Sequence, residues 1–224
     1  MQPTTLSIEG AKSEKVKLLL EVLLVATVFM TLRWIFSSIK YSSQIAEVIS
    51  LVLITYLFVK RKTSWREVGF TLPTNWIKSI GLTILCIVSI GVIFNFVIQP
   101  LFPHGANEIN EGNSVISFNV MLFQLFFIGI GAAAIGEEMM FRGFLLNHLN
   151  TLFGRNAIGT TLAILLQALI FGVLHSGVQG MVSAGVIGII LGTFYVLAGR
   201  NLLVVMVAHA VPDVLSIVGS YQSQ

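Results

Sequence analysis

Three short patterns in the apolar C-terminal half of the chain carry residues that could do acid–base or metal chemistry. They read Glu-Glu-Met-Met-Phe-Arg at 137–142, Phe-Gly-Val-Leu-His at 171–175 and His-Ala-Val-Pro-Asp at 209–213. The only other charged residues after position 113 are Arg155 and Arg200. Burying a carboxylate in hydrocarbon is costly unless it is paired or hydrated, so the three patterns are candidates for one intramembrane hydrolytic site.

The first pattern combines an ion pair with a spare carboxylate. On a helix, Glu138 and Arg142 are four residues apart and can neutralise each other. Glu137 lies about 100° further round the helix and stays unpaired, which suits a general base or acid. The alternative is a buried structural ion pair with Glu137 facing a water pocket.

The other two patterns supply imidazoles. Phe171 and His175 share a helix face, and His175 ends a span, where the alternative is a histidine at the membrane interface. His209 and Asp213 are also four residues apart, and Pro212 between them removes a backbone donor and tends to bend the helix. For these two residues the alternative is a buried hydrogen-bonded pair.

The depth of these side chains in the membrane depends on two turns between the spans. If Gly154 turns a helical hairpin, Glu137 and His175 differ in depth by only ~6 Å. The connection 199–201 folds the next pair of spans in the same way and brings His209 and Asp213 toward the same level. We therefore expect two imidazoles and the carboxylates to converge in one cavity.

This convergence fits two chemistries. In the first, zinc is held by two imidazoles and a carboxylate while a glutamate activates the metal-bound water, and the candidate ligands are His175, His209, Asp213 and Glu137. In the second, Glu137 and His175 activate water without a metal, while His209 and Asp213 hydrogen-bond the developing oxyanion. The spacing leaves both open. The chain has no HExxH or GxSxG motif and no pair of aspartates, so zincin, serine and aspartyl schemes have no support.

The composition places these patterns in a membrane. With 55% hydrophobic residues, 10% charged residues and a mean hydropathy of +0.90, the chain has too little polar surface for a soluble globule. The single cysteine, Cys86, excludes an intrachain disulfide. The predicted fold is all-α, a polytopic transmembrane helical bundle of about seven spans, with six to eight as the range. Apolar runs long enough for these spans lie at about 17–39, 45–59, 77–98, 114–136, 157–174, 181–198 and 202–218.

Charge in the connections predicts an orientation. The lysines before the first span and the basic residues of 60–78 are separated by two spans, so both groups lie on one side, which should be the cytoplasm. This bias also explains the net charge of +3, so we expect a lipid bilayer and no nucleic acid as a partner. The run 114–151 fits either one kinked span or two crossings, and the two arrangements present Glu137 to opposite sides.

The chain divides by function at about residue 113. Residues 1–113 form the N-terminal membrane spans and a loop, without a residue assigned to chemistry, and Glu21 and Arg33 are expected to snorkel toward the interfaces. The loop-like segment 100–113 contains His104, Glu108 and Glu111, which are predicted to be solvated rather than metal-binding. His148 is predicted at the interface. Residues 114–224 form the predicted catalytic membrane core.

With its three patterns in order, the chain resembles the CAAX protease and bacteriocin-processing (CPBP, or Abi) family, whose signatures are EExxxR, FxxxH and HxxxN or HxxxD. The likeness covers about residues 114–218. It implies that Glu137 is the catalytic glutamate, that Glu138, Arg142 and Phe171 support the site, and that His175, His209 and Asp213 are catalytic or metal-binding.

Asp213 stands where the prenyl-protein-processing members of this family have asparagine. An amide can donate a hydrogen bond to an oxyanion and an ionised carboxylate cannot, so Asp213 favours metal ligation at this position. The family has been described both as metalloproteases and as glutamate-dependent proteases, and zinc stays a candidate cofactor beside a metal-free glutamate mechanism.

The resemblance implies an intramembrane endopeptidase, with or without a metal, that cleaves a membrane-embedded peptide or protein. Relatives act in CAAX prenyl-protein processing or in bacteriocin processing and self-immunity. With short loops and no soluble domain, the chain is expected as a multi-pass protein of a bacterial cell membrane. The rival hypothesis is a non-enzymatic immunity or scaffold protein that binds a bacteriocin or a membrane partner. A transporter is disfavoured because the charges form a local site instead of a relay. The sequence carries no signal for an oligomeric state.

Overall fold

The computed structural model describes residues 8–102 and 116–222, and within these residues every regular element is a helix. The first part contains α1 (Ile8–Ile35), α2 (Ser42–Lys60) and α3 (Trp76–Ile93), which continues through η1 (Phe94–Ile98) and α4 (Gln99–Leu101). One long helix follows, made of α5 (Phe118–Phe123), η2 (Gln124–Glu137), η3 (Met139–Leu146) and α6 (Asn147–Phe153). The last elements are α7 (Ala157–Val173), α8 (Gly177–Leu197) and α9 (Leu202–Gln222). The predicted all-α class is confirmed.

Six of the described helices are long and apolar enough to cross a membrane. The seventh apolar helix, α7, is shorter, at 17 residues. This agrees with the expected range of six to eight spans. The segment Phe118–Phe153 is one continuous helix of 36 residues, so this part of the chain fits one crossing and not two.

Much of the long helix has widened turns with i→i+5 hydrogen bonding, in η2 and η3. Wide turns leave backbone carbonyls that need other donors, and such turns concentrate at functional sites. Asn147 meets part of this need, because its Nδ2 donates to the carbonyls of Arg142 (3.0 Å) and Gly143 (2.9 Å). The same Nδ2 lies 2.7 Å from the Tyr195 hydroxyl. A buried side chain therefore supplies donors to backbone carbonyls in the wide turns beside the first motif.

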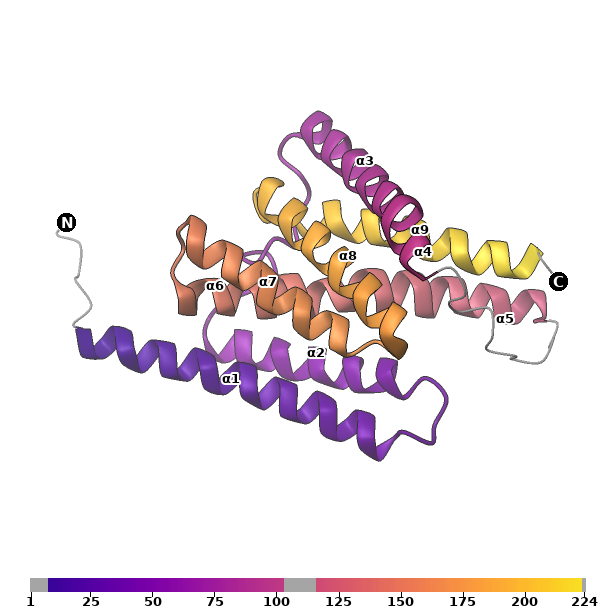
Figure 1. The fold of residues 1–224 in the computed structure, drawn as a ribbon. Coiled ribbons are helices and arrows are strands. Elements are labelled where there is room, and N and C mark those ends of the chain that lie inside the picture. The colour runs from indigo at the N-terminus through magenta and orange to yellow at the C-terminus, as the bar shows by residue number, and fades with distance from the viewer. Residues whose placement is uncertain (1–7, 103–115, 223–224) are drawn as a thin grey trace.

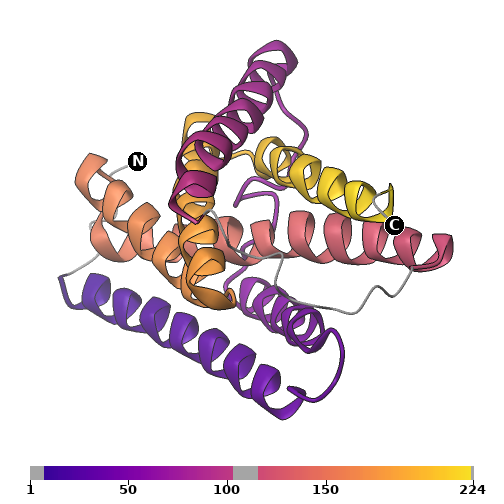
Figure 2. The same cartoon turned by 45° about the vertical axis from the view of Figure 1, so that its right-hand side comes forward.

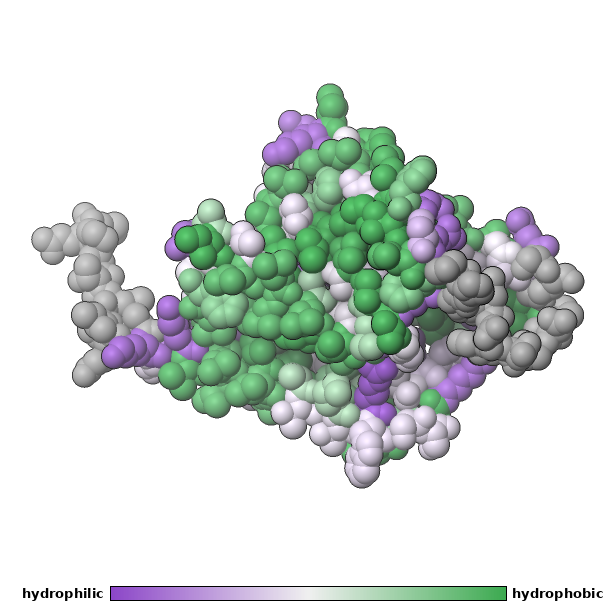
Figure 3. All heavy atoms as spheres, in the orientation of Figure 1, coloured by the Kyte–Doolittle hydropathy of each residue, from purple (hydrophilic) through white to green (hydrophobic). Residues whose placement is uncertain are grey.

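The helices form an open bundle around the long helix (Figures 1 and 2). The α1–α2 hairpin packs along one side of it, the α7–α8 hairpin crosses it, and α9 runs beside η2, with α3 packed on α9. The turns of the two C-terminal hairpins are made where predicted, at Gly154 (φ +100°) and at Gly199 (φ +69°). The face seen in Figure 3 is largely apolar, and Trp34, Ile77 and Phe96 are among the exposed apolar residues, each more than 70% exposed. Such a surface suits contact with lipid.

Candidate active site

Glu138 is the centre of the buried polar cluster. Its Oε1 accepts hydrogen bonds from Arg142 Nη1 and from His209 Nδ1, both at 2.8 Å. The Glu138 and Arg142 side chains are fully buried, and that of His209 is 10% exposed. The predicted Glu138–Arg142 pair is present, and it has a further partner that sequence spacing did not reveal. Because the carboxylate also binds an imidazole of α9, it orients His209 as well as neutralising Arg142.

The other ring nitrogen of His209 faces two more carboxylates. Its Nε2 lies 3.6 Å from Asp213 Oδ2 and 4.0 Å from Glu137 Oε2. The Glu138 carboxylate can only accept, so the proton of the short contact is on Nδ1. When His209 carries a second proton, its Nε2–H points into the space between Glu137 and Asp213. The first and third motifs therefore meet, as predicted.

His175 has its tautomer set by the backbone. Its Nδ1 is 2.8 Å from the carbonyl oxygen of Phe171, and a carbonyl can only accept a hydrogen bond. The proton of neutral His175 is therefore on Nδ1, which leaves a lone pair on Nε2. The ring also packs edge-on against Phe171, with centroids 4.7 Å apart. A histidine held in this way can accept a proton or ligate a metal through Nε2.

Phe171 connects the three motifs. Besides His175, its ring faces His209 at 6.4 Å between centroids, and the guanidinium carbon of Arg142 lies 5.0 Å from its centre. Phe141 packs edge-on against the same ring at 4.8 Å. Phe171 is buried, so it spaces the two imidazoles and covers the cation with an aromatic face.

Glu137 and His175 line one polar cavity of about 220 Å³. The remaining polar lining comes from the turns around it and from the first two spans, and Phe29, Met140, Phe141, Phe171 and Leu174 form the apolar walls. The Glu137 side chain is 24% exposed, in contrast to the sealed Glu138. Of the two adjacent glutamates, Glu137 is thus the one accessible to water and substrate.

Two charged residues of the cavity wall come from the N-terminal spans, to which sequence reasoning assigned no chemistry. Glu47 of α2 is 5% exposed, and its Oε1 has no hydrogen-bond partner among the described residues. Arg33, in the last turn of α1, donates from Nη1 to the Leu174 carbonyl (2.7 Å) and lines the cavity. A Cβ at position 136 would overlap Glu47 Oε1, so glycine at this position permits the close approach of α2 to the long helix.

Two further residues, Glu21 and His148, form a separate cluster. Glu21 is paired with Arg61 (2.6 Å), and it lies 3.3 Å from His148, which is buried instead of interfacial. This cluster lies away from the catalytic motifs and ties α1 to the end of α2. His104, Glu108 and Glu111 lie outside the described residues.

The possible zinc ligands that the structure describes are not grouped as a zinc site requires. Within residues 8–102 and 116–222, no three His, Cys, Asp or Glu side chains are grouped closely enough to hold a metal ion. The Nδ1 of His209 is occupied by Glu138, and His175 reaches the cavity from the turn between α7 and α8. In this arrangement the side chains of the described residues do not fit a metal centre.

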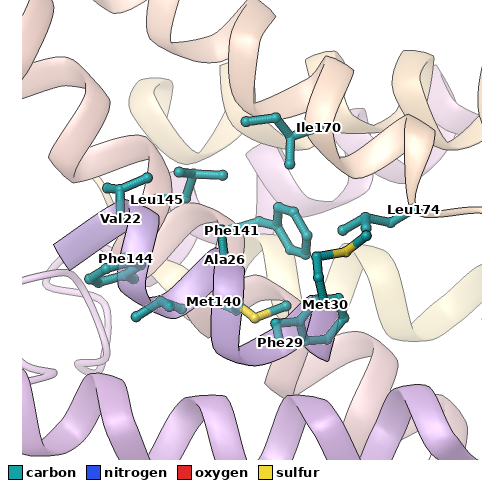
Figure 4. Close-up of a pocket in the computed structure, with 11 residues that line it drawn as sticks. Val22, Ala26, Phe29, Met30, Met140, Phe141, Phe144, Leu145, Ile170 and Leu174 are labelled. Atoms are coloured by element: carbon teal, nitrogen blue, oxygen red, sulfur yellow. The ribbon is translucent and has the colours of Figure 1, made fainter. Parts of the chain in front are cut away.

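A second pocket, entirely apolar, adjoins the cavity. Figure 4 shows side chains from α1, η3 and α7 around a space of about 100 Å³. Phe29, Met140, Phe141 and Leu174 line both this pocket and the polar cavity. A molecule with an apolar part could therefore occupy the pocket while its polar part lies beside Glu137.

Comparison with known proteins matches one segment of the chain to a protein family. Residues 118–215 match the family model described as type II CAAX prenyl endopeptidase Rce1-like, a segment that contains all three motifs. Searches of curated proteins and of solved structures found no significant match. Members of this family are proteases that act in membranes, and the helices described above supply the required spans. The expected resemblance to the CPBP family is thus confirmed over residues 118–215, the segment that matches the Rce1-like model of type II CAAX prenyl endopeptidases.

Proposed function

We propose that this chain hydrolyses a peptide bond of a membrane-associated peptide or protein, with Glu137 as the general base and without a metal. The observation that carries the proposal is the cavity shared by Glu137 and His175. It places a water-accessible carboxylate near an imidazole whose Nε2 lone pair is free to accept, within a membrane-spanning bundle. General acid–base catalysis needs such acceptors within reach of the attacking water.

The first step is the attack of water on the scissile carbonyl carbon. Glu137 accepts a proton from the water, and His175 Nε2 accepts a hydrogen bond from its other O–H, so the water lone pair is directed at the carbon. As the C–O bond forms, negative charge develops on the carbonyl oxygen. The Nε2 of His209 lies 4.0 Å from Glu137 Oε2, and in doubly protonated His209 its N–H stabilises that oxyanion.

The second step is the collapse of the tetrahedral intermediate. The C–N bond breaks, the carbonyl reforms as a carboxylic acid, and Glu137 returns its proton to the leaving amine. Glu137 is thereby restored for the next cycle. Glu138 and Arg142 do not touch the substrate in this scheme. They are positioning residues, because Glu138 holds the His209 ring through Nδ1.

Asp213 has a narrower role than an asparagine would have. As an ionised carboxylate it cannot donate to the oxyanion. At 3.6 Å from His209 Nε2 it instead favours the charged imidazolium. The apolar pocket beside the cavity holds the hydrocarbon part of the substrate, either an apolar side chain or a lipid group. We further propose a bacterial cell membrane as the location and bacteriocin or peptide processing as the setting.

The test uses the full chain reconstituted in liposomes. The substrates are a farnesylated, internally quenched CAAX peptide and a library of hydrophobic peptides read by mass spectrometry. Glu137→Gln and His175→Ala are each expected to lower cleavage by about 10²–10⁴-fold at unchanged protein abundance. Glu67→Gln is the matched control, because Glu67 is an exposed glutamate of the connection 61–75. Cleavage retained by both cavity variants would overturn the proposal in favour of a non-enzymatic immunity or scaffold protein.

A further inference from the structure

We propose that the catalytic cavity opens on the extracytoplasmic side of the membrane, so that its substrate is an exported or surface-held peptide or protein. The orientation follows from the fold and the charges alone. The statement about the substrate rests also on the proposed hydrolytic function.

The cavity lies at one end of the bundle. Arg33 is in the last turn of α1, Glu47 is in the second turn of α2, and His175 is in the turn between α7 and α8. The bond from Arg33 Nη1 to the Leu174 carbonyl joins the end of α1 to the end of α7. Both turns lie toward the right of Figure 1. The α1–α2 and α7–α8 turns therefore mark the cavity end.

The long helix begins at this same end. The ring of Tyr41, in the α1–α2 turn, lies 5.6 Å from that of Phe123 in α5. Glu137 lies near the middle of Phe118–Phe153, and the lining of its cavity extends to the α1–α2 and α7–α8 turns, at the end where the long helix begins. The two arrangements that the sequence allowed are thus reduced to one.

The opposite end is defined by contacts between other connections. The backbone N–H of Leu202 donates to the carbonyl of Gly69 (2.9 Å), and Asn201 Nδ2 donates to the carbonyl of Thr71 (3.0 Å). These bonds join the connection 61–75 to the α8–α9 turn. Arg200 also bonds to Asn147, the first residue of α6. The connections after the second, fourth and sixth helical crossings therefore lie together, away from the cavity.

The basic residues are almost all at this opposite end. The protein has 13 Lys and Arg residues, of which Arg33 and Lys40 lie at the cavity end and Arg142 is buried in the cluster. Short cytoplasmic connections are enriched in Lys and Arg, and this bias sets the orientation of polytopic proteins. The end away from the cavity is therefore cytoplasmic. Its basic residues are Lys12, Lys15, Lys17, Lys60, Arg61, Lys62, Arg66, Lys78, Arg155 and Arg200.

The apolar pocket indicates how a substrate would lie in the bundle. Along α1 it reaches from Met30 back to Val22, so it lies deeper in the bundle than Arg33 at the cavity. At 1.5 Å per residue, Val22 and Arg33 differ in depth by about 16 Å. A substrate would place its apolar part in the pocket and its scissile bond beside Glu137, and its polar part would extend toward the α1–α2 and α7–α8 turns. This arrangement suits a peptide anchored in the outer leaflet.

The test measures orientation independently of catalysis. Cys86, the single cysteine, is fully buried and can be replaced by alanine, after which single cysteines are placed at two exposed positions. Ser38→Cys lies in the α1–α2 turn, and Thr74→Cys lies in the connection 61–75. A membrane-impermeant maleimide applied to intact cells is expected to label Ser38→Cys, and to label Thr74→Cys only after permeabilisation. The reverse pattern, or labelling of both in intact cells, overturns the proposal.

A second measurement tests the side from which substrate is taken. A farnesylated peptide with a sulfonated, impermeant fluorophore is added outside right-side-out and inside-out vesicles. Cleavage that depends on Glu137 is expected to be at least 10-fold faster in right-side-out vesicles. Faster cleavage in inside-out vesicles overturns the proposal. Absence of cleavage in both preparations counts against the proposed function, and the maleimide pattern then decides the orientation.

Discussion

Removing the Glu138 carboxylate should destabilise the protein far more than removing that of Glu137. Glu138→Ala leaves Arg142, whose side chain is fully buried, without its ion-pair partner at 2.8 Å. Removing one member of a buried pair costs about 3–5 kcal/mol, because the remaining charge is buried without compensation. Glu137 is 24% exposed and makes no contact with Arg142 shorter than 4.0 Å, so Glu137→Ala should cost about 1 kcal/mol or less.

The measurement is reversible unfolding in mixed detergent micelles, with proteolytic activity followed in parallel. The double variant Glu138→Met with Arg142→Met is the informative control, since apolar replacement of both members of a buried pair is often neutral. It should recover most of the stability lost in Glu138→Ala. It should not recover activity, because His209 Nδ1 would still lack its acceptor. The reasoning is refuted if Glu138→Ala is no less stable than Glu137→Ala, or if the double variant is as unstable as Glu138→Ala.

Three further predictions concern the wall of the cavity, the apolar pocket beside it and the metal content of the protein. Gly136→Ala introduces a Cβ that overlaps Glu47 Oε1, so activity should fall at least 10-fold, and Glu47→Ala in the same chain should restore folding as judged by thermal stability. An unchanged thermal midpoint in Gly136→Ala alone would contradict this contact. Ala26→Phe fills the apolar pocket, so it should raise the KM for a farnesylated peptide and leave kcat within about twofold, as measured by steady-state kinetics. An equal rise in KM for a peptide without a lipid would argue against lipid binding in this pocket. Metal analysis of purified protein should find no stoichiometric zinc, and zinc lost on His175→Ala would instead support the metal mechanism.

The local part of the site could be predicted from the sequence. The Glu138–Arg142 and His209–Asp213 proximities follow from i,i+4 spacing on a helix, and the helix geometry alone is enough to foresee them. The hairpin at Gly154 likewise follows from a glycine between two apolar runs, and its φ of +100° explains why glycine is found there. These features depend on residues close together in the chain.

The contacts between distant helices could not be predicted. The bond from His209 to Glu138 depends on how α9 is rotated against the long helix, and no spacing along one helix encodes that rotation. Glu47 escaped notice for the same reason: it lies near the start of an apolar run, where a charge normally faces the headgroups. Its inward direction is set by the close approach of α2 to Gly136. The roles assigned to the site residues, the division at residue 113 and the use of zinc stay predictions.

The bond between Glu138 and His209 also has a consequence for biosynthesis. The chain is made from its N-terminus, so the helix that carries Glu137 and Glu138 enters the membrane before α9 is complete. Until α9 packs beside η2, Glu137 has no imidazole Nε2 opposite it, and the oxyanion donor of the proposed mechanism is missing. Under that mechanism we expect a nascent chain to be inert. Hydrolysis of neighbouring membrane proteins would then begin only after the bundle has closed, when the walls of the cavity restrict access to it.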